Sequence, residues 1–184
     1  SKAVLVASKA RRISLVEIKN NKISVLKTAV ILPELSAESE LTSGDIVYKN
    51  NEAIAIALTQ TILTNDGGGK QIDCGGKLLF INISEQSFGE LISQIEVGPM
   101  PDSVAISADA NWAITADERD GPEAWGKCTV AGKTPSISVI SLKKGIDKPE
   151  LKSTISLSAN AKDEPREPEF VAIAANSNDV AVTL

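Results

Sequence analysis

The chain has 184 residues, which is long enough for one domain with a buried core, and its net charge at pH 7 is −5. This charge, together with only three Phe, two Trp and one Tyr, argues against nucleic acid or an anionic membrane as a partner. No apolar run approaches the ~18 residues of a membrane span, so membrane insertion is not expected. The chain has no histidine, which excludes Ser-His-Asp and Cys-His catalysis and histidine-based zinc or haem sites.

Three short apolar segments near the N-terminus predict strands over residues 3–7, 13–18 and 23–30. The pair Asn20-Asn21 separates the last two, and asparagine tolerates the backbone of tight turns. The three segments match the second, third and fourth strands of the four-stranded units that follow. Residues 3–30 are therefore expected to form a partial unit.

Residues 45–97 carry the pattern of a complete antiparallel unit. The pair Asn50-Asn51 separates its first two strands, and a turn-former cluster at residues 84–87 separates its last two. A long loop is expected over residues 59–76, between the second and third strands. The predicted strands cover residues 45–47, 53–58, 78–83 and 91–97.

The next unit, residues 102–158, repeats this order most clearly. Residues 100–118 predict a strand, a tight turn at Asp109-Ala110-Asn111 and a second strand, because turn formers bound short β-branched runs. A second long loop is expected over residues 117–135. Two further strands are predicted over residues 137–142 and 151–157.

Residues 169–184 repeat only the first half of a unit. Their opening motif, Pro-acid-x-Val-Ala-Ile, also occurs at Pro101, and a turn at residues 176–179 leads into a final strand. Four-stranded antiparallel units that recur about every 60 residues are typical of propeller blades, although known blades are often shorter. A β-sandwich is the alternative.

The fold class predicted for residues 1–184 is therefore all-β, a partial β-propeller of about three four-stranded blades that is incomplete at both ends. A blade cannot bury both of its faces alone. We therefore expect the chain to be a fragment of a larger propeller, or a subunit whose open blade edges pair with another protein chain.

Two stretches, residues 101–118 and 167–184, resemble extracellular propellers with surface-layer and lactonase-like repeats. More closely, Pro-Asp-Ser-Val, Trp-Ala-Ile-Thr-Ala-Asp-Glu and Ser-Ile-Ser-Val-Ile-Ser-Leu are similar to the choice-of-anchor I family. The resemblance covers residues 97–184 well and residues 1–96 only through the blade pattern. It implies a secreted or surface-anchored propeller without an established general activity, and an extracellular or cell-surface location.

Acidic side chains on the long, glycine-bearing loops suit Ca²⁺, which prefers oxygen ligands. The alternative is that these carboxylates are solvated surface groups. No spacing matches an EF-hand, and the Gly67-Gly68-Gly69 run lacks the Lys-Ser/Thr ending of a P-loop. A hydrolytic pair of Glu118 with Asp120 or Glu123 is a further alternative. The candidate metal ligands are Asp66, Asp73, Asp117, Glu118 and Asp120.

Cys74 and Cys128 are the only cysteines, and both fall in the expected long loops. Adjacent loops can bring two cysteines within disulfide distance, so a Cys74–Cys128 bridge is predicted, with two unpaired thiols as the alternative. Trp125 and Glu123 are candidates for ligand or partner contact, whereas Trp112 is expected in the core, facing a neighbouring blade.

Three functions remain open from the sequence. The first is a non-catalytic, surface-associated binding and scaffold propeller. The second is a Ca²⁺-dependent hydrolase of the lactonase or phytase-like propeller type, and the third is a subunit of a larger assembly.

Overall fold

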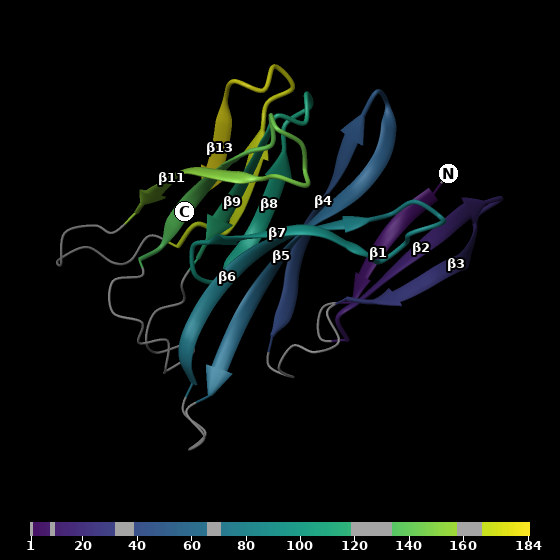
Figure 1. Cartoon of the computed structure of the whole chain (residues 1–184), viewed down its shortest axis with the longest axis horizontal. Helices are drawn as coiled ribbons and strands as arrows, with labels where there is room; N and C mark the ends of the chain where they lie inside the picture. Colours follow the sequence, from purple (N-terminus) through teal and green to yellow (C-terminus); the bar gives the residue numbers. More distant parts are fainter. Residues whose placement is uncertain (1, 8–9, 32–38, 66–70, 119–133, 158–166) are drawn as a thin grey trace.

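The computed structural model describes residues 2–7, 10–31, 39–65, 71–118, 134–157 and 167–184. Within these residues every regular element is a strand (Figure 1). This part of the chain accordingly contains no helix able to cross a lipid bilayer. The strands are β1 (Lys2–Ala7), β2 (Arg12–Lys19), β3 (Lys22–Val30), β4 (Glu40–Lys49), β5 (Glu52–Asn65), β6 (Gln71–Asn82), β7 (Leu91–Val97), β8 (Pro101–Ile106), β9 (Trp112–Asp117), β10 (Ser136–Ser141), β11 (Glu150–Ser156), β12 (Phe170–Ile173) and β13 (Val180–Thr183).

The strands form four antiparallel sheets, and in each sheet neighbours in sequence are neighbours in space. The first sheet has the order β1-β2-β3 and the second β4-β5-β6-β7. In the third sheet the order from one edge to the other is β8-β9-β10-β11, and the fourth contains β12 and β13. The all-β fold class predicted from the repeats is confirmed.

Tight turns join the first two strands of the second, third and fourth sheets. Positive φ values in such turns explain the residue types found there. Asn50 and Asn51 have φ values of 52° and 63°, and Asn20 and Asn21 between β2 and β3 have 50° and 58°. Two successive residues with positive φ match the right-handed twist of paired strands, and asparagine tolerates this region. The β4–β5, β8–β9 and β12–β13 turns all lie at the upper end of the molecule in Figure 1.

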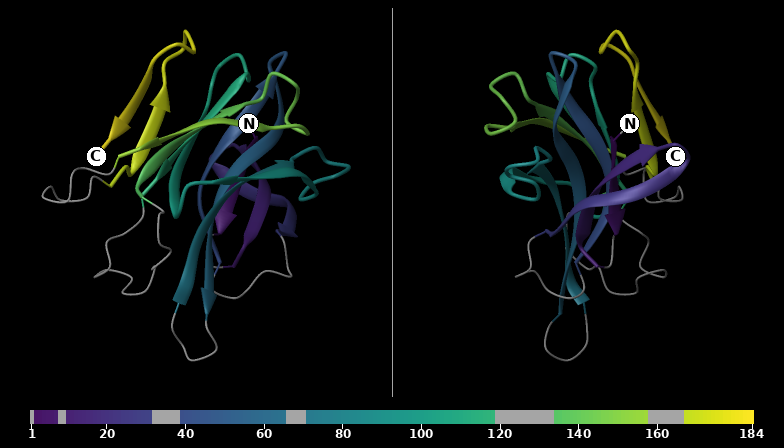
Figure 2. Two further views of the ribbon diagram at one scale, coloured as in Figure 1. Left: turned by 60° about the vertical axis from the view of Figure 1, so that its left-hand side comes forward. Right: turned by 90° about the vertical axis from the view of Figure 1, so that its right-hand side faces the viewer.

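The expected loop over residues 59–76 is wrong for most of its length. β5 continues to Asn65 and β6 begins at Gln71, with Leu63 paired to Cys74 and Thr64 to Asp73. Residues 59–64 contain three threonines and Ile62, and β-branched residues of this kind favour an extended strand even where the segment is polar. The resulting hairpin extends beyond the other strands at the lower end of Figure 2.

Both faces of the second sheet are buried, because successive side chains of a strand point to opposite faces. On β5, Ala55 and Ala57 pack toward the third sheet, whereas Ile56 and Leu58 pack toward the first. The third sheet repeats this arrangement, since Val104 packs against the second sheet while Ala105, Ile114 and Ala116 pack against Val171 of the fourth. Sheets stacked face to face in chain order are propeller blades, which excludes the two-layer sandwich.

The first strands of successive sheets are also joined directly. Asp45 Oδ2 on β4 accepts a hydrogen bond from the Ile106 backbone N–H on β8 at 2.8 Å. Ser103 Oγ on β8 accepts one from the Val171 backbone N–H on β12 at 3.2 Å. These contacts join β4 to β8 and β8 to β12.

Candidate functional site

Few of the predicted site residues fall within the described part of the chain. Asp73 and Cys74 lie in the β5–β6 hairpin, Asp117 ends β9, and Glu118 follows it. The other predicted ligand, disulfide and contact residues lie outside the described residues: Asp66, Asp120, Glu123, Trp125 and Cys128.

Asp117 is a buried carboxylate and not a loop residue, which corrects the expected loop boundary at this position. Its side chain is fully buried. Thr115 Oγ1 donates to Oδ1 at 2.7 Å, and Ser138 Oγ and Ser136 Oγ donate to Oδ2 at 2.6 and 3.0 Å. Burial raises the pKa of Asp117 to about 6, against the opposing effect of these hydrogen bonds.

The Asp117 carboxylate also holds the connection between the second and third sheets. The Gly98 backbone N–H, between β7 and β8, donates to Asp117 Oδ2 at 3.2 Å. A Cβ on Gly98 would lie 2.3 Å from both Asp117 Oδ2 and Ser136 Oγ, so only glycine fits there. The four donors occupy both carboxylate oxygens, so Asp117 holds the connection between β7 and β8 against β9 and β10.

Glu118 differs from Asp117, because its side chain is half-buried and its backbone N–H donates to the Met100 carbonyl at 3.0 Å. Among the residues with described side chains, no three Cys, Asp or Glu come together as a metal site. The Ca²⁺ set proposed from the sequence therefore stays a prediction.

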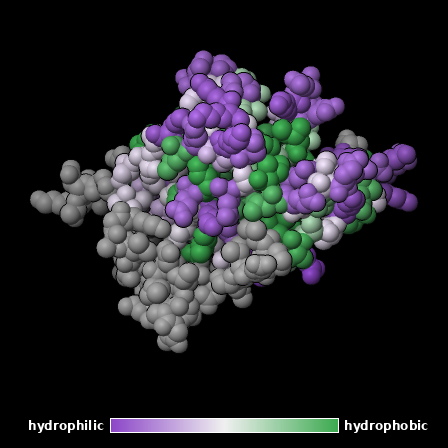
Figure 3. All heavy atoms as spheres, viewed as in Figure 1, coloured by the Kyte–Doolittle hydropathy of each residue, from purple (hydrophilic) through white to green (hydrophobic). Residues whose placement is uncertain are grey.

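A cavity lies instead between the second and third sheets, at the end that carries the short turns. Its volume is about 520 Å³, within the usual range for ligand sites, and two other inter-sheet cavities measure about 250 and 200 Å³. Figure 3 shows apolar side chains exposed between hydrophilic groups on the side of the molecule seen in Figure 1. The lining residues are Val47, Tyr48, Lys49, Asn50, Ile54, Ala108, Asp109, Ala110, Asn111, Leu142, Lys143, Gly145, Ile146 and Asp147.

The floor and the rim of this cavity differ in polarity. Val47 and Leu142 are buried in the core shared by the two sheets, and Ile54 and Ile146 pack against it. The rim carries polar side chains from three turns, and Tyr48 is 54% exposed. An apolar base with a few polar groups around it is the usual construction of a small-molecule site.

Asp109 fixes the turn between β8 and β9 on one side of the cavity. Its carboxylate accepts from Ser107 Oγ at 2.6 Å, from the Asn111 N–H at 3.0 Å and from Asn111 Nδ2 at 2.8 Å. These hydrogen bonds, led by the one from Ser107, lower the pKa of Asp109. Ala110 in the same turn has a φ of 52°. These hydrogen bonds hold this wall of the cavity in place without a ligand.

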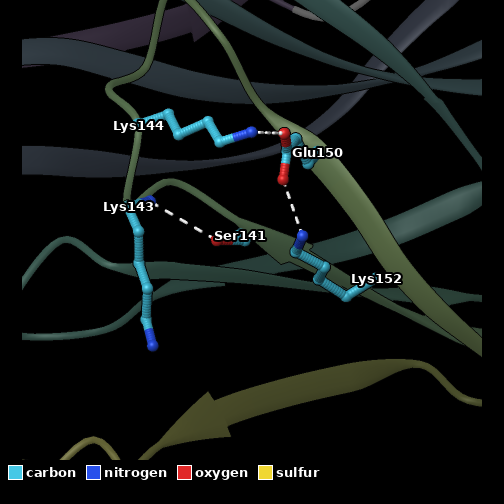
Figure 4. A network of polar contacts seen from close by, with 5 residues as sticks. All are labelled: Ser141, Lys143, Lys144, Glu150 and Lys152. Atoms are coloured by element: carbon cyan, nitrogen blue, oxygen red, sulfur yellow. Dashed lines mark hydrogen bonds and ion pairs between the residues drawn. The ribbon is translucent and has the colours of Figure 1, made fainter.

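The opposite wall is the turn between β10 and β11, where two neighbouring lysines have different surroundings (Figure 4). Lys144 pairs with Glu150, which also accepts from Lys152 Nζ at 2.6 Å. The two lysines lower the pKa of Glu150 to about 2, with Lys144 the larger cause. Lys143 extends away from this network, and its Nζ lies 4.7 Å from the centroid of the Trp112 ring.

Sequence reasoning missed this site because it assigned only short turns to this end of the sheets. Tyr48, Lys49 and Asn50 were recognisable as the end of a strand and its turn, but nothing in their order shows that they face residues about a hundred positions away. Trp112 was expected to face a neighbouring blade, and it does line the smaller cleft against Ile173 and Val180.

Comparison with a solved structure supports the fold. A crystal structure of a protein from Lactobacillus plantarum superposes with a TM-score of 0.56 at 10% identity, covering 84% of this chain and 38% of that one. A functionally unknown protein from Desulfotomaculum acetoxidans scores 0.44 at 10% identity, covering 99% and 59% of the two chains. Kuenenia stuttgartiensis hydrazine synthase scores 0.41 at 11% identity, covering 98% and 58%. The chain thus spans less than two thirds of each of these structures.

No curated protein matches the chain. A family model does match, and it extends over the whole of residues 1–184. The stacked four-stranded sheets, the repeated turn positions and this match lead to one conclusion: the chain belongs to the choice-of-anchor I family, as a β-propeller module.

Proposed function

We propose that this module is a non-catalytic binding and scaffold domain, acting outside the cell or at its surface. The observation that carries the proposal is the cavity of about 520 Å³ between the second and third sheets. It combines an apolar floor with polar groups on pre-formed turns, which is what binding requires. The name of the family, choice-of-anchor I domain, supports the location.

The wall of the cavity offers a way to test binding without disturbing the core. Ala108 is an exposed cavity-lining residue in the β8–β9 turn. Ala175 holds the same position in the β12–β13 turn, is also exposed, and lines none of the three cavities. Ala108→Trp fills the cavity, whereas Ala175→Trp adds the same side chain elsewhere.

The measurement is ligand-observed NMR with a panel of saccharides, nucleotides, amino acids and small carboxylates. Panel members that bind the unchanged protein are expected to lose binding by at least tenfold in Ala108→Trp and to keep it in Ala175→Trp. Equal binding to both variants would mean that the ligand sits elsewhere.

The hydrolase alternative has a separate test. The same protein is assayed with Ca²⁺ on lactones, phosphoesters and glycosides, alongside Glu118→Gln. Reproducible turnover that Glu118→Gln abolishes would contradict a non-catalytic function.

We also propose that the open sheet edges pair with further propeller strands or with another protein chain. Among the described residues, β1 pairs only with β2, and β13 only with β12. Phe170 is 60% exposed on the outer face of the fourth sheet, whereas Ser103, its counterpart in the third sheet, is 2% exposed beneath β12. An unpaired edge beside an apolar face is suited to β-augmentation.

A further inference from the structure

We infer that Asn82 is an acceptor site for N-linked glycosylation, with a lipid-linked oligosaccharide diphosphate as the sugar donor. The inference goes beyond the proposed binding function and rests on one part of it, the location outside the cell. Asn82, Ile83 and Ser84 form the acceptor sequence Asn-x-Ser, in which x is not proline. No other asparagine of the chain is followed two positions later by serine or threonine.

The side-chain amide of Asn82 has one atom engaged and one atom available. Asn82 is the last residue of β6 and leads into the turn before β7. Its Oδ1 accepts a hydrogen bond from the Ser84 backbone N–H at 2.8 Å. Within the described part of the chain, its Nδ2 has no hydrogen-bond partner. The side chain is half-buried and lines none of the three cavities. The nitrogen that would carry the sugar is therefore not used to hold the fold.

Other residues hold this turn in place. Ile83 is buried in the core between the first and second sheets. The Glu85 carboxylate accepts a hydrogen bond from Lys2 Nζ at 2.5 Å, and the Glu85 backbone carbonyl accepts one from Lys27 Nζ. A glycan on Asn82 would leave these three contacts intact, so the turn can carry a bulky group without losing its attachment to the first sheet.

The hydrogen bond between Asn82 and Ser84 closes an Asx turn, in which a side-chain oxygen binds the N–H two residues further on. It brings the two residues that the acceptor sequence specifies into direct contact. Ser84 is exposed, and its hydroxyl accepts only a long hydrogen bond, from the Ser87 N–H at 3.4 Å. A transferase can therefore reach the hydroxyl beside the acceptor amide.

A second turn of the same kind provides an internal comparison. Between β12 and β13, Asn176 Oδ1 accepts a hydrogen bond from the Asn178 N–H at 3.0 Å. Asn178 carries no hydroxyl, and Asn176 Nδ2 donates to Asp179 Oδ2 at 3.1 Å. Of these two turns, the one at Asn82 alone combines an unengaged amide nitrogen with a hydroxyl two residues further on.

The transfer itself is a substitution at the anomeric carbon of the first sugar. A bond forms between Asn82 Nδ2 and C1 of that sugar, and the bond from C1 to the diphosphate of the donor breaks. The lipid diphosphate leaves with the bonding electron pair, and the amide proton passes to a base of the oligosaccharyltransferase. No group is oxidised or reduced.

The experiment is expression of the full chain behind a signal peptide in a eukaryotic secretory host, followed by mass spectrometry of the secreted protein. Peptide-N-glycosidase in isotope-labelled water converts a glycosylated asparagine to a labelled aspartate, which identifies the modified position. Ser84→Ala removes the hydroxyl and keeps the backbone N–H of the Asx turn, whereas Ser84→Thr keeps a hydroxyl. Asn178→Ser is the matched control, because it gives Asn176 the acceptor sequence.

The unchanged chain and Ser84→Thr are expected to carry a glycan at Asn82, and both Ser84→Ala and Asn82→Gln should lose it completely. Asn178→Ser should gain a second glycan, at Asn176, in the same host. Circular dichroism of the secreted variants confirms that each one folds.

Two results would overturn the inference. The first is secreted protein without a glycan at Asn82, most directly when Asn178→Ser is modified at Asn176 in the same cells. The second is a glycan that persists in Ser84→Ala. Either result leaves ligand binding in the cavity untouched, because Asn82 does not line it and Ala108→Trp tests binding separately. A failure of this inference and a failure of the proposed function are therefore distinguishable.

Discussion

At the scale of single residues, Asp117 shows how a buried group can be assigned to the wrong environment. Its sequence context, Asp-Glu-Arg-Asp-Gly, resembles an exposed acidic loop. Asp117 is buried by Ser136 and Ser138 on β10 and by Gly98 in the connection between β7 and β8. Long-range partners of this kind cannot be derived from local sequence. The sequence therefore does not show that the Asp117 carboxylate is buried and hydrogen-bonded.

The raised pKa of Asp117 predicts a pH-dependent stability. The folded-state pKa of about 6 lies above the ordinary value of 3.8, so the folded protein binds the proton more tightly. The contribution is fully present below about pH 3.8 and is lost as pH rises through about 6. The loss amounts to about 3 kcal/mol by the size of the shift.

Asp117→Asn removes this titration, and urea unfolding between pH 4 and 7 measures the result. The unchanged protein should lose stability across this range relative to Asp117→Asn, while Asp102→Asn on β8 should follow the unchanged protein. Parallel curves for all three proteins would mean that Asp117 does not titrate in this window.

At the scale of elements, most strands could be predicted because alternation and turn residues are local signals. The Asn50-Asn51 turn and the strands beside it follow directly from the pattern. The exception is the β5–β6 hairpin, where a loop was expected over residues 59–76. Pairing between β5 and β6 makes this segment a strand. The sequence of one segment does not show which other segment it pairs with.

The same hairpin bears on the predicted disulfide. Cys74 lies in β6 near the end of the hairpin, paired with Leu63. Peptide mapping without reduction is expected to recover Cys74 and Cys128 in one linked species, which would reduce the freedom of the unfolded chain and add about 2–4 kcal/mol of stability. Complete alkylation of both thiols before reduction would contradict the bridge.

At the scale of the whole molecule, the stacking of sheets could be predicted from the repeat, because a unit with two apolar faces needs a neighbour on each side. The cavities between sheets could not be predicted from the repeat, because they depend on how the turns of adjacent units meet. The exposed outer face of the fourth sheet follows from the same stacking.

This exposed face predicts association in solution. Light scattering on the chain should give a mass above 19.4 kDa, because Phe170 and the β13 edge are open to pairing. Phe170→Ser should lower the associated fraction, whereas Tyr48→Ser, which removes an aromatic side chain of similar exposure, should not. A stable monomer of the unchanged chain would count against partners at the open edges.

The most direct test of the account is to locate the bound ligand on the protein. Backbone NMR shifts on titration with the tightest binder of the panel report which end of the sheets responds. The account predicts changes at residues 47–54, 108–111 and 142–147. Changes confined to residues 71–76, 98 and 117–118, at the opposite end of the sheets, would contradict it.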